Sequence, residues 1–340
     1  MKFWIGGATG FLGSHLVAVL KEAGHEMVLA SLSGGEVHGL PGSKVNILSP
    51  GEVARSARGC DGAFFVAGKV SRDVADADLM HRIHVLGTRH ALAELKAEKI
   101  PRVVYLSTSG TIAVGTDPKR AYDEQAPTPT ELVARWPYYR TKLYAEREAK
   151  LLNEPGVFDV ITVNPSLLLG PGDLRESSTA DIRRFLASEI PATPAGGISF
   201  VDVRDVAKTL LLAFEKGEAG ERYLLSAKNV TCVAFFELLE RLSGVPAPRL
   251  KMPSHRGLAI GANKLFNKAL RTFGGEPSVD EASVEMSQYF WYCDSGLAIK
   301  ELGFSPRDPS VTLRDTIADM EDREVVFPRG AVVHDSAGRS

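Results

Sequence analysis

The sequence predicts an α/β protein built on a doubly wound parallel sheet, and three observations point to this class. Short apolar runs alternate with amphipathic stretches through the first half of the 340-residue chain, the order expected of parallel strands joined by crossover helices. The first run, Phe3–Ile5, leads into the glycine-rich segment Gly6–Gly13 (GGATGFLG), and a helical pattern follows directly. The later run Gly62–Gly68 also ends in small residues, which leaves backbone accessible at the carboxyl edge of the sheet.

The glycine-rich segment is typical of an anion-binding turn. Gly7, Gly10 and Gly13 have the spacing G-x-x-G-x-x-G between a strand and a helix. The first glycine permits a tight turn, the second lets a phosphate approach the backbone, and the third allows close contact between helix and strand. Free N–H groups at the start of the helix favour a diphosphate there. Since glycine turns after a first strand are common, the motif alone also fits an ordinary turn.

The second strand, Glu26–Ser31, bears on the choice of cofactor. An acidic residue at its end would bind the ribose hydroxyls of NAD, but that position holds Ser31, followed by Leu32, Ser33 and two glycines. No side chain there repels a 2′-phosphate, and hydroxyls and amides can bind one, which favours NADP. Because no arginine stands there either, NAD stays open, as does an ordinary serine–glycine turn.

The alternation then continues to about residue 173. The expected elements are a strand, a helix, a buried strand, a long helix, a strand, a helix and a strand. In order they are Lys44–Leu48, Glu52–Gly59, Gly62–Gly68, Ala75–Glu98, Arg102–Leu106, Tyr138–Glu148 and Val157–Leu169. The long helix carries His81, His84 and His90, which we interpret as surface histidines because no H-E-x-x-H pattern accompanies them. No metal site is expected.

Beyond residue 173 the alternation loosens, which predicts a smaller mixed α/β C-terminal lobe that binds the substrate. Its expected elements, with those that return to the main sheet, are Ser177–Ala187, Ile198–Val203, Arg204–Lys216, Arg222–Leu225, Cys232–Leu242, Arg256–Phe273 and Gly296–Gly303. We therefore expect a dinucleotide-binding domain at 1–173, to which 198–226 return. The substrate lobe comprises 174–197 and 227–323, and 324–340 form a disordered tail.

Composition limits the function classes. With 24% charged residues and a net charge of −2, the chain has no basic excess for nucleic acid. Its longest apolar runs are too short to span a bilayer. Three widely separated cysteines form neither a disulfide framework nor a zinc cluster. These features favour a cytoplasmic protein that acts on a small molecule.

Tyr138 and Lys142 form the pair most suggestive of chemistry. They stand four residues apart, so they share a face of the expected helix, and Tyr138 alone among eight tyrosines has a lysine at this spacing. A phenol, with an ordinary pKa of about 10, exchanges protons poorly near neutrality. A nearby ammonium would lower that pKa and could also hold the ribose of a nicotinamide. A surface Tyr/Lys pair remains the alternative.

Ser109 follows the strand Arg102–Leu106, at the carboxyl edge where such sheets bind ligands. Its hydroxyl could hydrogen-bond a carbonyl or alcohol oxygen beside Tyr138. Ser107 and Thr108 compete for this role, and a capping turn is the alternative reading.

Together, the glycine spacing, Ser109 and Tyr138-x-x-x-Lys142 resemble the extended short-chain dehydrogenase/reductase superfamily, which contains the NAD-dependent epimerases and dehydratases. The likeness covers about residues 1–320 and includes Phe200–Val206 (FVDVRDV). Leu106–Val114 and Asn164–Leu174 resemble the dihydroflavonol-4-reductase-like branch.

The resemblance implies a Rossmann-type fold, a homodimer and a Ser109, Tyr138 and Lys142 catalytic set. It also implies that Asn46 and Ile47 contact adenine and that Asn164 and Pro165 lie near the nicotinamide. The whole cofactor-binding set is Gly7, Thr9, Gly10, Phe11, Leu12, Gly13, Ser31, Asn46, Ile47, Ala67, Gly68, Ser107, Tyr138, Lys142, Asn164 and Pro165. The chain departs from the family at His84, where asparagine is usual, and at Ser31–Leu32.

Three functions follow as hypotheses. The first is an NAD(P)-dependent oxidoreductase that interconverts a ketone and a secondary alcohol. The second is a sugar-nucleotide epimerase or dehydratase, which would need cations such as Arg175, Arg183 and Arg184 for the substrate diphosphate. The third is a non-catalytic NAD(P)-binding regulator, a class that usually lacks the Tyr/Lys pair kept here.

Overall fold

The computed structural model describes residues 1–253, 257–261 and 281–326 and is organised around a seven-stranded parallel sheet in the order β3-β2-β1-β4-β5-β6-β9. The strands are β1 (Lys2–Gly6), β2 (Glu26–Ser31), β3 (Gly42–Lys44), β4 (Gly62–Phe65), β5 (Arg102–Leu106), β6 (Asp159–Pro165) and β9 (Arg222–Leu225). The order reverses between β1 and β4, the point at which such sheets bind ligands. The predicted fold class is confirmed.

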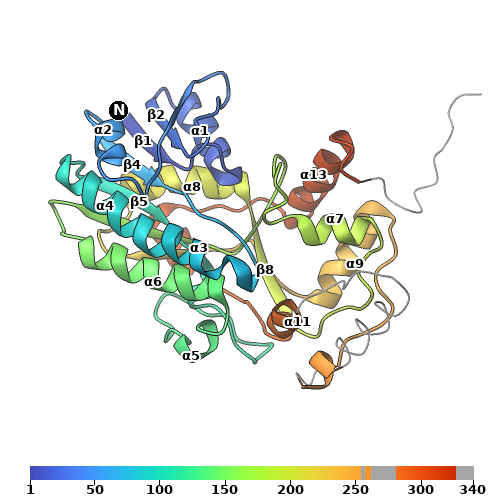
Figure 1. Ribbon diagram of the computed structural model, residues 1–340. Helices are drawn as coiled ribbons and strands as arrows, with labels where there is room; N and C mark the ends of the chain where they lie inside the picture. Colours follow the sequence, from blue (N-terminus) through green and yellow to red (C-terminus); the bar gives the residue numbers. More distant parts are fainter. Residues whose placement is uncertain (254–256, 262–280, 327–340) are drawn as a thin grey trace, which may run out of the picture.

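Helices cover both faces of this sheet (Figure 1). One face packs against α1 (Phe11–Glu22), α8 (Val203–Lys216) and α12 (Gly296–Leu302) through a core that includes Leu16, Leu210 and Leu302. The other face packs against α2 (Glu52–Ala57), α4 (Gly87–Ala97) and α6 (Pro137–Leu152). Each helix buries one apolar stripe against the strands, which is why the helical periodicity was visible in the sequence.

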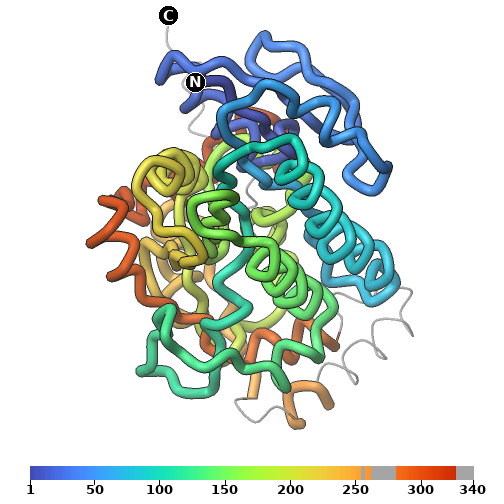
Figure 2. Tube along the Cα trace, turned by 90° about the vertical axis from the view of Figure 1, so that its left-hand side faces the viewer, coloured from blue at the N-terminus to red at the C-terminus, as the bar shows by residue number. Residues whose placement is uncertain are grey.

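A second, three-stranded mixed sheet forms the lobe, in the order β10-β8-β7. Its strands are β7 (Leu167–Leu169), β8 (Gly197–Asp202) and β10 (Lys228–Thr231), and its helices are α7 (Ala180–Leu186), α9 (Cys232–Ser243) and α13 (Pro309–Asp322). They enclose a separate core in which Phe185 and Phe236 stack with ring centroids 5.5 Å apart. The lobe helices α7, α9 and α13 stand to the right of the main sheet in Figure 1, and in the turned view of Figure 2 the lobe lies behind the main sheet.

Three expected strands differ from the structure. The expected Lys44–Leu48 strand instead ends at Lys44, because Asn46 turns the chain by accepting the Leu48 N–H at 3.0 Å. The expected Val157–Leu169 strand divides at Ser166 into β6 and β7, which pair in different sheets. The expected return of 198–226 to the main sheet begins only after β8, which pairs with β7 and β10.

The remaining elements are short. The expected helix Ala75–Glu98 is built from η1 (Val74–Asp76), α3 (Ala77–His81), the π-helical turn η2 (Arg82–Leu86) and α4. The other pieces are η3 (Ser109–Thr111), α5 (Thr130–Val133) and α11 (Glu281–Met286).

Two sequence predictions concern residues that the structure describes only in part. Most of the expected helix Arg256–Phe273 and residues 327–340 of the expected tail lie outside the described residues. Within the tail segment, Val326 is buried in the lobe core. In the part of the chain that is described, no helix has the length and apolar character needed to cross a membrane.

Candidate active site

The glycine loop between β1 and α1 fits a dinucleotide diphosphate. Gly7 has a φ of +91°, and a Cβ there would approach the backbone of Ala67 to 2.7 Å. A Cβ at Gly13 would collide with the Gly7 carbonyl oxygen, so both positions need glycine. Helix α1 begins at Phe11 with Gly10 as its N-cap and no side-chain cap. The first-turn N–H groups, which have no helical partner, are thus open to an anion.

Lys142 lies under the carboxyl end of β5. It is only 4% exposed, its ammonium donates to the Leu106 carbonyl oxygen at 2.6 Å, and it stands 5.2 Å above the Tyr105 ring. Burial lowers the pKa of Lys142 to about 8, and Glu146 opposes that shift. Because an ammonium carries three N–H donors, two remain for ribose hydroxyls.

Tyr138 lies one turn before Lys142 on α6, with its ring edge-to-face against His84 at 5.8 Å and against Tyr139 at 5.1 Å. Burial raises the pKa of Tyr138 well above its ordinary value, Tyr139 adds to this, and a hydrogen bond with the Thr108 side chain opposes it. The sequence predicted a pKa lowered by Lys142, and this arrangement gives the opposite direction. A phenol with a raised pKa is protonated at neutral pH, the state required of a proton donor.

The three hydroxyls after β5 point to different partners. The Thr108 side chain lies close enough to the Tyr138 phenol to oppose the rise of its pKa. The Ser109 side chain is buried near Cys293, whose thiol lies 3.5 Å from the Ser199 hydroxyl. Burial raises the pKa of the Cys293 thiol to about 11, and these serines oppose the shift. Ser107 donates to Glu146. Thr108, which the sequence left as a competitor, therefore lies near the phenol, and the role of Ser109 stays a prediction.

Glu146 is a site residue that sequence reasoning missed. Its Oε1 accepts hydrogen bonds from Ser107, from Thr111 at 2.8 Å and from Asn164 Nδ2 at 2.7 Å. Its Oε2 lies 3.4 Å from Arg222, and the side chain is only 6% exposed. The carboxylate thus ties the turn after β5 to α6. The available signal was its spacing, since it stands four residues after Lys142 on the same helix face.

Asn164 is part of this hydrogen-bond network through its amide nitrogen. It is fully buried at the end of β6, and its Nδ2 also donates to the Thr108 carbonyl oxygen at 2.9 Å. The resemblance implied that Asn164 lies near the nicotinamide. In this structure its amide nitrogen bonds protein oxygens, so we infer that it positions the Thr108 turn.

His84 is not the surface histidine that the sequence predicted; it is 2% exposed. Its Nε2 accepts the Lys69 N–H at 3.1 Å, so Nδ1 carries the proton and donates to the Thr141 hydroxyl at 2.8 Å. Burial lowers the pKa of His84 to about 3, and Lys142 adds to the shift. This neutral imidazole connects the loop after β4, which contains Gly68, to the helix of Tyr138.

His84 should make folding sensitive to acid. Its folded pKa of about 3 lies below the ordinary 6.5, so below pH 6.5 the unfolded chain gains a proton that the folded chain does not. Wild type should therefore lose about 3 kcal/mol relative to His84→Asn between pH 6.5 and pH 4. Urea denaturation of both proteins across this range tests the expectation, and a constant difference between them would contradict it.

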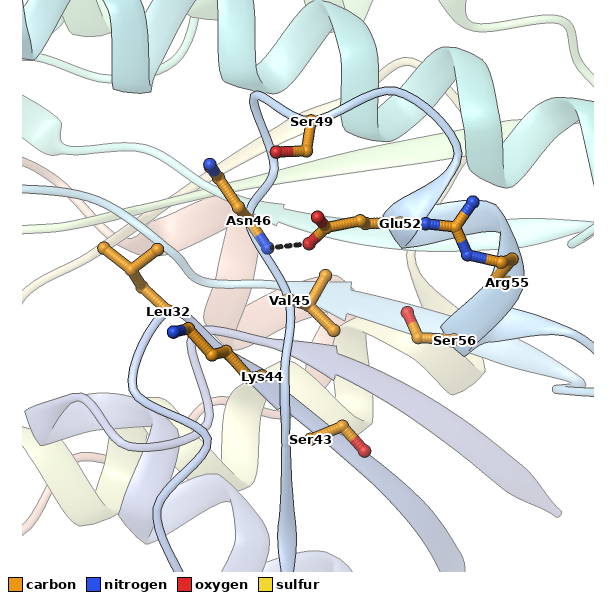
Figure 3. Close-up of a pocket in the computed structure, with 9 residues that line it drawn as sticks. All are labelled: Leu32, Ser43, Lys44, Val45, Asn46, Ser49, Glu52, Arg55 and Ser56. Carbon is orange, nitrogen blue, oxygen red and sulfur yellow. Dashed lines mark hydrogen bonds between the residues drawn. The ribbon is translucent and has the colours of Figure 1, made fainter.

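Three further residues of the predicted cofactor set lie at or just after the ends of β2 and β3. Asn46 borders an open groove of about 660 Å³ at the ends of β2 and β3 (Figure 3). Ile47 instead contacts α4, since a Cβ at Gly87 would lie 2.6 Å from its Cδ1. Ser31 is buried and its hydroxyl accepts the Gly34 N–H at 3.0 Å.

The chain is similar to known proteins over nearly its whole length. The family model described as "NAD dependent epimerase/dehydratase family" matches residues 4–226. A Synechocystis sp. protein provisionally named dihydroflavonol 4-reductase is 34% identical over 93% of this chain and 92% of its own. Sterol demethylase protein B of Methylococcus capsulatus is 30% identical over 96% and 100%. The crystal structure of gox2253 superposes with a TM-score of 0.81 at 27% identity, covering 96% and 99%.

Proposed function

Since the chain belongs to the NAD dependent epimerase/dehydratase family, we propose that it is an NAD(P)H-dependent reductase that converts a ketone of a small organic molecule to a secondary alcohol. The observation that carries this proposal is the placement of Tyr138 and Lys142. They lie on consecutive turns of α6 beside the end of β5, while the glycine loop lies at the end of β1 in the same sheet. A dinucleotide bound at the loop can therefore extend toward Tyr138.

The relatives support reduction as the reaction. The extended short-chain dehydrogenase/reductase assignment, with dihydroflavonol-4-reductase-like relatives, is confirmed by the family match and by the Synechocystis protein. That relative is named as a reductase of a flavonoid ketone, and the second is named for work on a sterol. Both names refer to rigid ring compounds, so the substrate that we propose is a compound of this kind that carries a ketone.

Each residue of the proposed site has its own role in the reduction of the ketone. A bound nicotinamide supplies a hydride to the carbonyl carbon. The neutral Tyr138 phenol gives its proton to the carbonyl oxygen, so that the alcohol forms without a free alkoxide. A hydroxyl from Thr108 or Ser109 hydrogen-bonds the same oxygen and orients it. Lys142 holds the ribose and, as an ammonium, stabilises the phenolate that Tyr138 becomes.

The second hypothesis, a sugar-nucleotide epimerase, needs cations for a substrate diphosphate. Arg183 bonds Glu176 at 2.8 Å, and Arg184 lies 3.9 Å from Asp181. These two arginines are therefore engaged by acidic neighbours, which weakens the case for a nucleotide sugar, and the exposed Arg175 is the third cation that this hypothesis named.

Cofactor consumption distinguishes the three functions. Purified protein would be titrated with NADPH and NADH, then incubated with a dihydroflavonol, a keto sterol and UDP-glucose while absorbance of the reduced cofactor is followed. Loss of reduced cofactor with a ketone supports the reductase. Conversion of UDP-glucose without net consumption supports the epimerase. Tight cofactor binding with neither reaction across a wide carbonyl panel supports the regulator.

Cofactor affinity should depend on the charge of Lys142. Its pKa of about 8 means that the ammonium loses its proton above that pH, so NADPH binding should weaken as pH rises from about 7 to 9.5. Lys142→Met should bind NADPH weakly at every pH and show no such weakening. Tyr138→Phe should show it as wild type does, because the raised pKa of Tyr138 lies beyond this range. Fluorescence titration measures it, and a flat wild-type profile would exclude the ribose-holding role.

A further inference from the structure

The groove beside β3 lies where the adenosine of the proposed cofactor must go, and this inference rests on the proposed function to that extent. Tyr138 fixes the nicotinamide end near β5, and the glycine loop fixes the diphosphate at β1. In the sheet order β3-β2-β1-β4-β5, the strands β2 and β3 lie on the opposite side of β1 from β5. The adenosine therefore lies over the ends of β2 and β3.

The loop after β2 and the strand β3 form one wall of this groove. Gly34 has a φ of +69°, and a Cβ there would approach the backbone nitrogen of Lys44 to 2.9 Å. A Cβ at Gly35 would lie 3.8 Å from the Thr9 side chain of the glycine loop. The loop thus runs between the diphosphate site and Lys44, in contact with both.

Lys44 supplies the cation that the sequence did not show at the end of β2. It is the register partner of Ser31, its side chain is exposed, and Figure 3 shows it beside Leu32 among the residues that line the groove. No carboxylate of the described residues lies within ion-pair distance of Lys44.

The other charged groups of the groove lie on α2. The Glu52 carboxylate accepts the Asn46 N–H at 2.7 Å, and Arg55 extends from the opposite wall, beyond Val45 (Figure 3). The groove therefore has two cations and one carboxylate, and that carboxylate already accepts a backbone N–H. The lining includes no acidic residue from the end of β2, the position at which such a residue would bind a free 2′-hydroxyl pair.

We propose that Lys44 binds the 2′-phosphate of a 2′-phosphorylated adenosine and so makes the chain selective for NADP over NAD. The hydroxyl of Ser33, which lies 3.3 Å from that of Ser31, is the second donor to the phosphate. An ammonium–phosphate hydrogen bond is charge-assisted and stronger than a neutral one, and at an open site it weakens with added salt.

The test uses adenosine fragments, so that it does not depend on turnover. Calorimetric titration of the full chain with 2′,5′-ADP and with 5′-AMP should give at least about tenfold tighter binding of 2′,5′-ADP. Lys44→Met should remove most of that preference while 5′-AMP binding stays unchanged, which also shows that the variant is folded. Lys44→Arg should keep the preference.

Arg55→Met is the matched control, since it removes an exposed cation from the other wall of the same groove. Arg55→Met should leave the preference for 2′,5′-ADP intact. An equal loss in both variants would mean that the overall charge of the groove attracts the phosphate, and it would overturn the inference. Equal wild-type affinity for the two fragments would overturn the Lys44 assignment but leave cofactor binding standing. Binding of neither fragment, nor of NADPH, would overturn both. Binding without any reductase activity would count against the proposed function alone.

Discussion

The variant Tyr138→Phe is expected to lose ketone reduction by about 10²–10⁴-fold in kcat while its affinity for NADPH stays unchanged. Removing the hydroxyl takes away the group proposed to give its proton to the carbonyl oxygen. The ring, which packs edge-to-face against His84 and Tyr139, remains, so the fold and the cofactor site should not change. A selective loss in kcat is the signature of a group that acts on the reacting atoms.

Tyr139→Phe provides the matched control, because it removes the same hydroxyl from the next residue. Tyr139 stacks on Trp291 with ring centroids 4.7 Å apart and belongs to an apolar cluster with Trp136. Its ring, and not its hydroxyl, makes these contacts, so activity should remain close to wild type. Near-normal turnover in Tyr138→Phe, or an equal loss in both variants, would remove Tyr138 from the reaction.

The sequence predicted the main sheet well because local and global signals agree there. The strands β2, β5 and β9 begin and end where the apolar runs do, since a strand buried on both faces needs an unbroken run. The failures occur where side-chain hydrogen bonds redirect the chain, as at Asn46 after β3. The division at Ser166 could not be seen either, because both halves of the apolar run are buried, one in each sheet.

The site was predictable as a set of residue types and not as a set of contacts. Tyr138 and Lys142 are linked by helical spacing, which a sequence displays directly. Which hydroxyl lies near the phenol depends on the tight turn at Ser109–Thr111, and Thr108 is the one that affects the Tyr138 pKa. His84 was misassigned because the π-helical turn η2, in which it lies, alters the helical register that assigns faces.

Glu146 was also missed because a sequence does not display contacts. Its removal is the second change for which we expect a large effect. Deleting this buried carboxylate removes the acceptor of three donors and the counter-ion of Arg222, and it leaves the Ser107 hydroxyl without the acceptor that it has in the structure. Glu146→Ala should therefore lower the free energy of unfolding by about 3–5 kcal/mol, and Glu146→Gln, which keeps an acceptor oxygen, by about 2 kcal/mol. Urea denaturation at neutral pH measures both.

Glu148→Gln is the control on the same helix, because the Glu148 pair with Arg89, at 2.7 Å, lies at the surface with Arg89 51% exposed. It should cost less than about 1 kcal/mol, and Glu146 variants no more costly than this one would refute the structural role. A second readout separates positioning from stability. Since Glu146 opposes the lowering of the Lys142 pKa, Glu146→Gln should move the alkaline loss of NADPH binding to a lower pH. A purely structural carboxylate would leave that profile where it is.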